Sequence, residues 1–325
     1  MRITRVLKEF VFDVTEASTA SVHASTVLRL GDGTVLAAWF GGTKEKDSDV
    51  RIWVARRTAQ GWEKPYSIES AINQAHWNPV LFEKKSGEIC LYYKIGEEIK
   101  EWKTYVASSF DGGKSFSESR ELVEGDIGGR GPVKNKPIYL SNGTLLAPAS
   151  DETTPEWFAF MDLSEDDGKT WTKVRIEKPD EPYAKRIATM IQPTLWEEPL
   201  GEVHALLRTN RGYAYRTDSK DFGKTWSTAY ITTVPNNNSG LDLVKMENGT
   251  LALVSNPVAR HAGERTPLTL AFSYDNGMTF ENVLTLEDHK GEYSYPAIVS
   301  QGNKLFITYT HQRTTIAYVE VDCVT

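Results

Sequence analysis

Side chains that could bind anions or transfer protons stand near the ends of apolar runs in this chain. Arg208 follows the run 202–207, and Arg265 stands shortly before the run 268–272. Two guanidinium groups that converge on one point would bind a carboxylate by paired hydrogen bonds. Asp49 follows the run 34–40 and could protonate a leaving oxygen if burial raised its pKa. Tyr293 precedes the last such run, and a tyrosine hydroxyl needs a partner that lowers its pKa before it can attack.

Six turn-and-strand units would position these residues. In each unit a turn containing glycine precedes a β-rich apolar run, as at Asp32-Gly33 before TVLAAWF and at Asn248-Gly249 before TLALVS. The other turns contain Gly87, Gly143, Gly201 and Gly302, so the units recur at steps of roughly 50 residues. A glycine turn before an apolar run is typical of a hairpin strand. Six such strands predict six four-stranded blades, with site residues where the strands leave the ring.

A second repeat runs through the chain with the same period. It reads Ser-x-Asp-x-Gly-x-Thr-Trp at 164–171 and recurs at 109–116, 219–226 and 273–280, with a shortened copy at 57–62. The closing aromatic residues stand at 62, 116, 171, 226 and 280, which gives steps of 54, 55, 55 and 54 residues. Asp and Ser bond to nearby backbone N–H groups, and Gly supplies the positive φ of a tight turn. We interpret the repeat as a structural hairpin turn.

The repeats predict an all-β fold, a six-bladed β-propeller that spans residues 1–325 as one domain. Five blades carry the repeat or its remnant. The sixth would combine an N-terminal strand at about 4–14 with C-terminal strands near 306–310 and 315–322. That pairing would close the ring and hide the sheet edges.

Composition excludes several classes of protein. The net charge is −7 and no dense Lys/Arg run occurs, so neither nucleic acid nor an anionic membrane is expected as a partner. The two cysteines, Cys90 and Cys323, imply no disulfide framework. The N-terminal stretch lacks the apolar core of a signal peptide, so we expect a cytoplasmic protein unless a signal peptide was removed. No metal-binding, P-loop or dinucleotide motif is present, and no cofactor is expected.

The Ser-x-Asp-x-Gly-x-Thr-Trp repeat resembles the Asp-box, or BNR repeat, of the sialidase (neuraminidase) superfamily. Four good copies in register make the resemblance specific for the fold, whereas Asp-boxes lie away from the catalytic face. The segments WNPV (77–80), GPVKNKP (131–137), IQPT (191–194) and PNNNSGLD (235–242) also resemble a bacterial and plant group of sialidase-like proteins.

The resemblance implies a set of roles. Sialidases use three arginines for the substrate carboxylate, a tyrosine nucleophile helped by a glutamate, and an aspartate as acid and base. Arg208 and Arg265 match the second and third arginines, Tyr293 matches the nucleophile, and Asp49, ahead of Asp47, matches the acid.

Two positions depart from the sialidase pattern. His23 stands where the first arginine is expected, and Gln192 stands where the glutamate partner of the tyrosine is expected. Gln cannot accept a proton. We expect further contacts with substrate at blade edges, from Lys136 above all, and from Asn78, Lys134 and Asn238. His311 and Arg313 could complete a basic ring.

Three functions remain open at this point. The first is an exo-acting glycoside hydrolase of the sialidase type, which removes a terminal acidic sugar from a glycan. The second is a lyase on uronate glycans, which would need a neutralised carboxylate and a base but no Tyr–Glu pair. The third is a glycan-binding propeller without activity. In each case the partner is a carbohydrate that carries a carboxylate.

Overall fold

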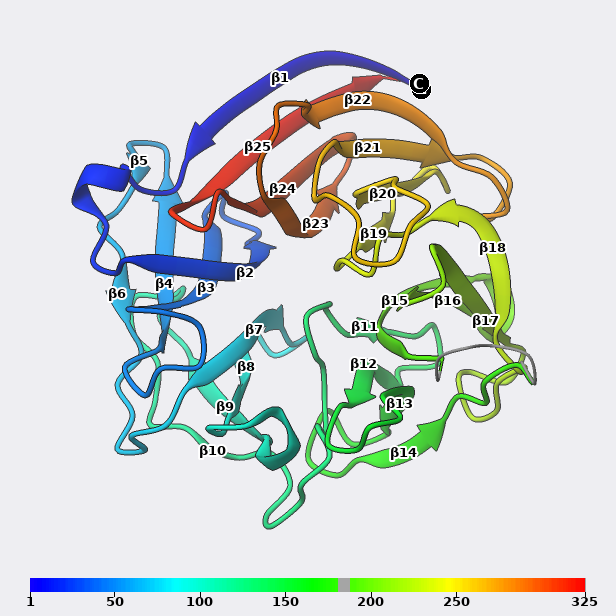
Figure 1. Cartoon of the computed structure of the whole chain (residues 1–325), viewed down its shortest axis with the longest axis horizontal. Helices are drawn as coiled ribbons and strands as arrows, with labels where there is room; N and C mark the ends of the chain where they lie inside the picture. The colour runs from blue at the N-terminus through cyan, green and yellow to red at the C-terminus, as the bar shows by residue number, and fades with distance from the viewer. Residues whose placement is uncertain (181–187, 325) are drawn as a thin grey trace.

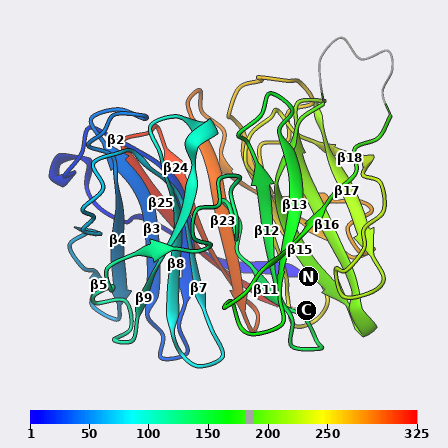
Figure 2. The same cartoon turned by 90° about the horizontal axis from the view of Figure 1, so that it is seen from below.

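The strands form six antiparallel sheets around one axis, which Figure 1 shows end on. The computed structural model describes residues 1–180 and 188–324. The six sheets confirm the predicted six-bladed β-propeller. Seen from the side, the strands run between the two ends of the disc (Figure 2).

The first three blades follow one another along the chain. Blade 1 contains β2 (Ser21–Arg29), β3 (Val35–Gly42), β4 (Arg51–Thr58) and β5 (Gly61–Trp62), and β6 (Tyr66–Ser67) also pairs with β4. Blade 2 contains β7 (His76–Glu83), β8 (Ile89–Ile95), β9 (Lys103–Ser109) and β10 (Arg120–Glu121). Blade 3 contains β11 (Ile138–Tyr139), β12 (Leu145–Asp151), β13 (Phe158–Ser164) and β14 (Thr172–Arg175).

The other three blades complete the ring. Blade 4 contains β15 (Met190–Glu198), β16 (Glu202–Thr209), β17 (Tyr213–Ser219) and β18 (Tyr230–Pro235). Blade 5 contains β19 (Asp242–Lys245), β20 (Leu251–Ser255), β21 (Leu268–Ser273) and β22 (Glu281–Glu287). Blade 6 contains β23 (Tyr293–Gln301), β24 (Lys304–His311), β25 (Thr315–Val324) and β1 (Arg2–Phe10). Short 3-10 helices occur at Val14–Glu16, Ile99–Glu101 and Pro199–Gly201.

Blade 6 closes the ring as the sequence predicts. The N-terminal strand β1 pairs antiparallel with the C-terminal strand β25, from Arg2 opposite Val324 to Phe10 opposite Ala317. Two segments from opposite ends of the chain therefore share one sheet, and the outer edge of β25 is covered.

The apolar runs after the glycine turns are the second strands of their blades. The first strands, β2, β7, β11, β15, β19 and β23, lie nearest the axis (Figure 1). Each first strand begins at the end of the disc where the second strand finishes. We call this end the entry end. The apolar runs are therefore one strand further from the axis than the first strands.

The four full repeat turns make the same hydrogen bonds. In the turn of blade 4, Ser219 Oγ donates to Asp221 Oδ1 (2.8 Å) and accepts from the Gly223 N–H (2.9 Å). Asp221 also accepts from the backbone and hydroxyl of Thr225. The turns at Asp111, Asp166 and Asp275 repeat this pattern.

The glycine of the repeat turn also packs against the preceding blade. Gly113 of blade 2 has φ +76°, and a Cβ built on it would lie 2.7 Å from the Leu36 side chain of blade 1. Gly277 of blade 5 would bring a Cβ within 3.0 Å of Trp196 of blade 4. The repeat turns therefore join blades and lie away from the chemistry, as the interpretation of the motif required.

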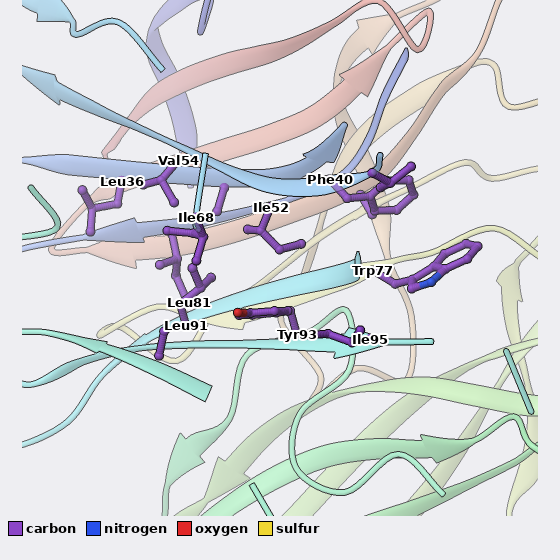
Figure 3. Packing of buried hydrophobic residues seen from close by; sticks show 14 of the residues in the cluster. Leu36, Phe40, Ile52, Val54, Ile68, Trp77, Leu81, Leu91, Tyr93 and Ile95 are labelled. Carbon is purple, nitrogen blue, oxygen red and sulfur yellow. The ribbon is translucent and has the colours of Figure 1, made fainter. Parts of the chain in front are cut away.

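Apolar side chains fill the spaces between adjacent blades. Figure 3 shows Leu36, Ile52 and Val54 of blade 1 facing Leu81 and Leu91 of blade 2. Alternation along each strand places these side chains between the sheets, where they are buried. This packing holds the blades at fixed angles, so that residues at the entry end converge on the axis.

Candidate active site

A residue with positive φ recurs near the entry end of every blade. The residues at this position have positive φ, between 45° and 64°, and are Ala24, Asn78, Lys134, Gln192, Asn238 and Tyr295. In four blades the strand register shifts at this point. A bulge reorients the side chains next to it. Three of the six residues precede proline, namely Asn78, Gln192 and Tyr295.

Arg208 is the buried cation of this ring. It is the penultimate residue of β16 and has 7% of its surface exposed. Its Nε donates to Asn238 Oδ1 (3.0 Å), and Nη1 donates to Gln192 Oε1 (3.0 Å) and to the Tyr295 hydroxyl (2.7 Å). All three partners are neutral. In the part of the chain that the structure describes, no carboxylate lies within hydrogen-bonding distance of Arg208. Its charge therefore remains available for a ligand anion.

Tyr295 stands between Arg208 and His23. Its ring centroid lies 4.3 Å from that of His23, and the guanidinium carbons of Arg208 and Arg265 lie 5.6 Å and 5.5 Å from the centre of the ring. The hydroxyl accepts the hydrogen bond of Arg208. A guanidinium donor stabilises negative charge on a phenolic oxygen.

His23 is a buried, neutral imidazole. Burial lowers its pKa well below the usual value, and Arg313, Arg265, Arg208 and Lys134 lower it further. Nε2 lies 3.4 Å from Nη2 of Arg313, which can only donate, so the proton is assigned to Nδ1. Nδ1 is buried and has no hydrogen-bond partner among the described residues.

Glu292 binds two arginines at once. Its Oε1 accepts from Nη1 of Arg265 (2.8 Å) and from Nε of Arg313 (2.9 Å). Glu45, on the loop after β3, holds Nη1 of Arg313. These four residues form a wall with two positive and two negative charges. We call it the ion-pair wall, and we call Arg208, Gln192, Asn238, Tyr295 and His23 the axial cluster.

A buried lysine lies below the axial cluster. Lys134 Nζ donates to Asn135 Oδ1 (2.8 Å), to the Leu241 carbonyl (3.0 Å) and to the Pro296 carbonyl. It therefore links the segment before β11 of blade 3 with the residue before β19 and with β23 itself. Burial lowers its pKa to about 7, although Asp242 opposes the shift. With three acceptors around its nitrogen, Lys134 forms the floor of the site.

The structure does not place Lys136 at the ligand surface. Its Nζ bonds both oxygens of Asp242 at 3.0 Å and the Leu243 carbonyl. Asp242 also accepts from Thr194 and from the Ile298 N–H. Lys136 therefore neutralises a buried carboxylate between blades, and the expectation that it contacts substrate loses its geometric basis.

Tyr293 lies apart from the axial cluster. It is buried in the apolar cluster of blades 5 and 6, its ring packs 5.1 Å from that of His311, and its hydroxyl accepts from Gln312 (2.8 Å). His311 itself faces Glu287 at 3.7 Å. The bulge places Tyr295, two residues later, at the axis in its stead.

The expected acid, Asp49, lies on the exposed loop 43–49. Its Oδ2 accepts from the backbone (2.9 Å) and the hydroxyl (2.7 Å) of Thr43. Glu45 is the carboxylate of this loop that belongs to the ion-pair wall. Asp49 thus lies beside the site without a contact to Arg208 or Tyr295.

The remaining candidate residues differ in whether their side chains make hydrogen bonds at the site. Asn238 and Gln192 contact Arg208, and Arg265 and Arg313 belong to the ion-pair wall. Asn78 is one of the six residues with positive φ near the entry end, and it is buried. Its side chain makes no hydrogen bond among the described residues.

Four residues at the site escaped sequence reasoning: Tyr295, Glu292, Glu45 and Glu152. Glu152 follows β12, is buried, and accepts from Ser150 Oγ (2.8 Å). Burial raises its pKa, while Ser150, Arg208, Lys94 and the side chain of Gln192 lower it. A signal for Tyr295 was present, since Tyr295-Pro296 repeats the Asn78-Pro79 and Gln192-Pro193 dipeptides.

Two other kinds of site have no support in the described residues. No group of three His, Cys, Asp or Glu side chains is placed to hold a metal ion. None of the described helices is long and apolar enough to cross a membrane.

The sequence matches a known family of proteins. The model of the BNR repeat-like domain matches residues 33–307. The chain belongs to the BNR repeat-like domain family. No curated protein matches it.

Solved structures share the fold at low sequence identity. A protein of unknown function from Dyadobacter fermentans has a TM-score of 0.78 and 16% identity, and the match covers 98% of this chain and 99% of that one. The Trypanosoma rangeli sialidase in complex with the inhibitor DANA gives 0.72 and 15%, covering 93% and 55%. The NanB sialidase of Streptococcus pneumoniae gives 0.70 and 13%, covering 94% and 68%. The chain thus spans about half of the trypanosomal sialidase, and the fold is the one that these propellers share.

Proposed function

We propose that the protein is an exo-acting glycoside hydrolase of the sialidase type, which removes a terminal, carboxylate-bearing sugar from a glycan. The observation that carries the proposal is Arg208. It is a buried guanidinium at the axis whose described partners are all neutral, and its Nη1 also bonds the hydroxyl of Tyr295. A ligand carboxylate would supply the missing counter-charge and bring the sugar against Tyr295.

In the proposed reaction Tyr295 is the nucleophile. Tyr295 would first release its phenolic proton to solvent, and the phenolate oxygen would form a bond to the anomeric carbon as the glycosidic C–O bond breaks. Water would then hydrolyse the tyrosyl intermediate and regenerate the phenolate, which takes its proton back from solvent. Arg208 stabilises the phenolic oxygen by its hydrogen bond. The leaving oxygen takes a proton from the loop 43–49, where Asp49 is a carboxyl group that no arginine holds. The second step returns this proton from water.

Elimination from a uronate is the second candidate, and one observation favours it. Among the described residues no carboxylate bonds the Tyr295 hydroxyl, whereas a neutral imidazole, His23, packs against the ring. In an elimination, Arg208 would neutralise the carboxylate of the uronate substrate. A base would remove the proton next to it, and the oxygen on the neighbouring carbon would leave with a proton. The products would be an unsaturated uronate and an alcohol.

Two tyrosines provide a matched test. Tyr295→Phe and Tyr293→Phe each remove one hydroxyl, two residues apart on one strand. Mass spectrometry of products from sialylated and uronate-bearing oligosaccharides would follow both variants. We expect Tyr295→Phe to lose about a hundredfold or more of the rate, as when a covalent nucleophile is removed, and Tyr293→Phe to stay close to wild type.

The products distinguish the mechanisms. A released acidic sugar that carries the elements of one water molecule indicates hydrolysis, and a fragment lacking them indicates elimination. If no substrate yields a product and Arg208→Met leaves the binding of acidic sugars unchanged, the proposal is refuted. Binding that depends on Arg208 without any product would leave a glycan-binding propeller.

A further inference from the structure

The ion-pair wall contains two arginines whose charge is already balanced. Arg265 and Arg313 share Oε1 of Glu292 at 2.8 Å and 2.9 Å, and Glu45 holds the outer nitrogen of Arg313. Ser294 Oγ donates to the same Glu292 oxygen at 3.3 Å. The wall therefore has no net charge, although it lies next to His23 and Tyr295.

Glu292 occupies the position that a ligand anion would take between these two guanidinium groups. Its side chain is 31% exposed, which compares with 27% for Arg265 and 30% for Arg313, so a ligand can reach all three. Its second oxygen, Oε2, makes no hydrogen bond within the described chain. A carboxylate that is held by two arginines on one side and open on the other is a fixed charge at the rim of the site.

Arg208 is a charged side chain of the axial cluster that no described carboxylate binds by a hydrogen bond. Its three hydrogen-bond partners are neutral, in contrast to those of Arg265 and Arg313. A ligand with one carboxylate can thus be matched at Arg208. A second anionic group near the wall would face Glu292 without a free guanidinium, and like charges at such distances disfavour binding.

We propose that Glu292 is a specificity-determining residue, which neutralises Arg265 and Arg313 so that the site accepts sugars with a single carboxylate and rejects more highly charged ones. The proposal rests on the proposed function in assigning the ligand carboxylate to Arg208. The hydroxyl groups of such a sugar would meet the ion-pair wall, which offers both donors and acceptors.

Calorimetric titration with two pairs of probes tests the proposal. One pair is methyl glucuronide and glucuronic acid 1-phosphate, and the other is N-acetylneuraminic acid and its 9-phosphate. The first member of each pair has one carboxylate, and the second adds a phosphate. The proteins are the wild type, Glu292→Gln and Glu281→Gln. The last variant is the matched control because it removes the same charge from an exposed glutamate on β22, the outer strand of blade 5, and leaves the ion-pair wall intact.

Glu292→Gln should reverse the preference of the site for the monoanionic probe over the phosphorylated one. We expect the wild type to bind the monoanion more tightly than the phosphorylated probe. The Glu292→Gln variant should bind the phosphorylated probe about tenfold more tightly than the wild type does, while Glu281→Gln changes little. Thermal melting confirms that each variant folds, and Glu292→Ala serves as a second variant if Gln retains the hydrogen bonds to the arginines.

The outcomes separate this proposal from the proposed function. An unchanged preference in both Glu292 variants overturns the role of Glu292 and leaves the function standing. If the Glu292 variants bind the phosphorylated probe more tightly than the wild type does, while no protein binds a monoanion, Glu292 acts as proposed. The assignment of a monocarboxylate sugar as ligand then fails. If no protein binds any probe, both fail, because two freed arginines must at least bind the phosphate.

Discussion

The lowered pKa of Lys134 allows a direct test of how the floor of the site is built. Its side chain is buried, with 2% of its surface exposed, and burial lowers its pKa from 10.5 to about 7. Lys94, between blades 2 and 3, is buried in the same way, and its pKa is also lowered to about 7. In the unfolded chain both amines return to ordinary values near 10.4, within about a unit.

The sign of the pH dependence follows from these shifts. Above about pH 7 the folded protein releases the protons of the two lysines, whereas the unfolded chain keeps them until about pH 10. The unfolded state therefore binds more protons in this window, and the free energy of unfolding rises with pH. A group that differs by nearly one proton contributes about 1 kcal/mol over one pH unit, so each lysine adds about 1 kcal/mol between about pH 7.5 and about pH 8.5.

Urea unfolding at several pH values measures these slopes. Lys134→Met should lower the rise in stability by about 1 kcal/mol per pH unit, and Lys94→Met should do the same. Lys114→Met, at an exposed position, is the control and should keep the wild-type slope. Other titrating groups contribute equally to all four proteins and cancel. A wild-type slope in Lys134→Met would refute the assignment of a largely neutral lysine below the axial cluster.

Three further substitutions test separate parts of the account. Asp162→Asn should cost about 3 kcal/mol in urea unfolding, because this fully buried carboxylate holds Arg130 by two hydrogen bonds; a loss below about 1 kcal/mol would contradict that role. Asp221→Ala should cost about 1–2 kcal/mol through the lost repeat-turn bonds, and stability equal to wild type would show that the turn does not need them. Gln192→Glu should weaken the binding of acidic sugars about tenfold in calorimetry, since a carboxylate at 3.0 Å would neutralise Arg208; unchanged affinity would argue against a free guanidinium.

The fold was accessible from the sequence because its signals are local and repeated. Each Ser-x-Asp-x-Gly-x-Thr-Trp turn is specified by bonds within one turn, as at Ser219 and Asp221. Four such turns and the shortened copy at 57–62, at steps of 54 or 55 residues, account for five blades, and the six glycine turns before apolar runs indicate the sixth. The closing strands at the two termini then follow from the need to cover sheet edges.

The site was only partly accessible because one residue of register decides which side chain reaches the axis. Tyr293 and Tyr295 have the same type and stand on the same strand, and only the bulge sends the second to Arg208. Lys134 and Lys136 pose the same problem on blade 3. Arg208 lies in the axial cluster, near where its place in the sequence suggested, because it stands one residue before the end of a regular strand, β16, where position along the strand predicts position in space.

Salt bridges between distant loops were not accessible from the sequence. Glu292 and Glu45 are 247 positions apart in the chain, and Arg313 joins them. No short-range pattern links charged loop residues of blades 1 and 6. Their pairing appears only when the ring has closed.

The most direct test of the central claim is calorimetric titration of acidic sugars into the wild type and Arg208→Met. The claim is that Arg208 is the charge that holds the ligand carboxylate. We predict binding of a monocarboxylate sugar by the wild type and a loss of about tenfold or more in Arg208→Met, with a weaker effect of Arg265→Met, whose charge Glu292 already balances. Equal affinity of wild type and Arg208→Met, in a variant that melts as a folded protein, would contradict the account.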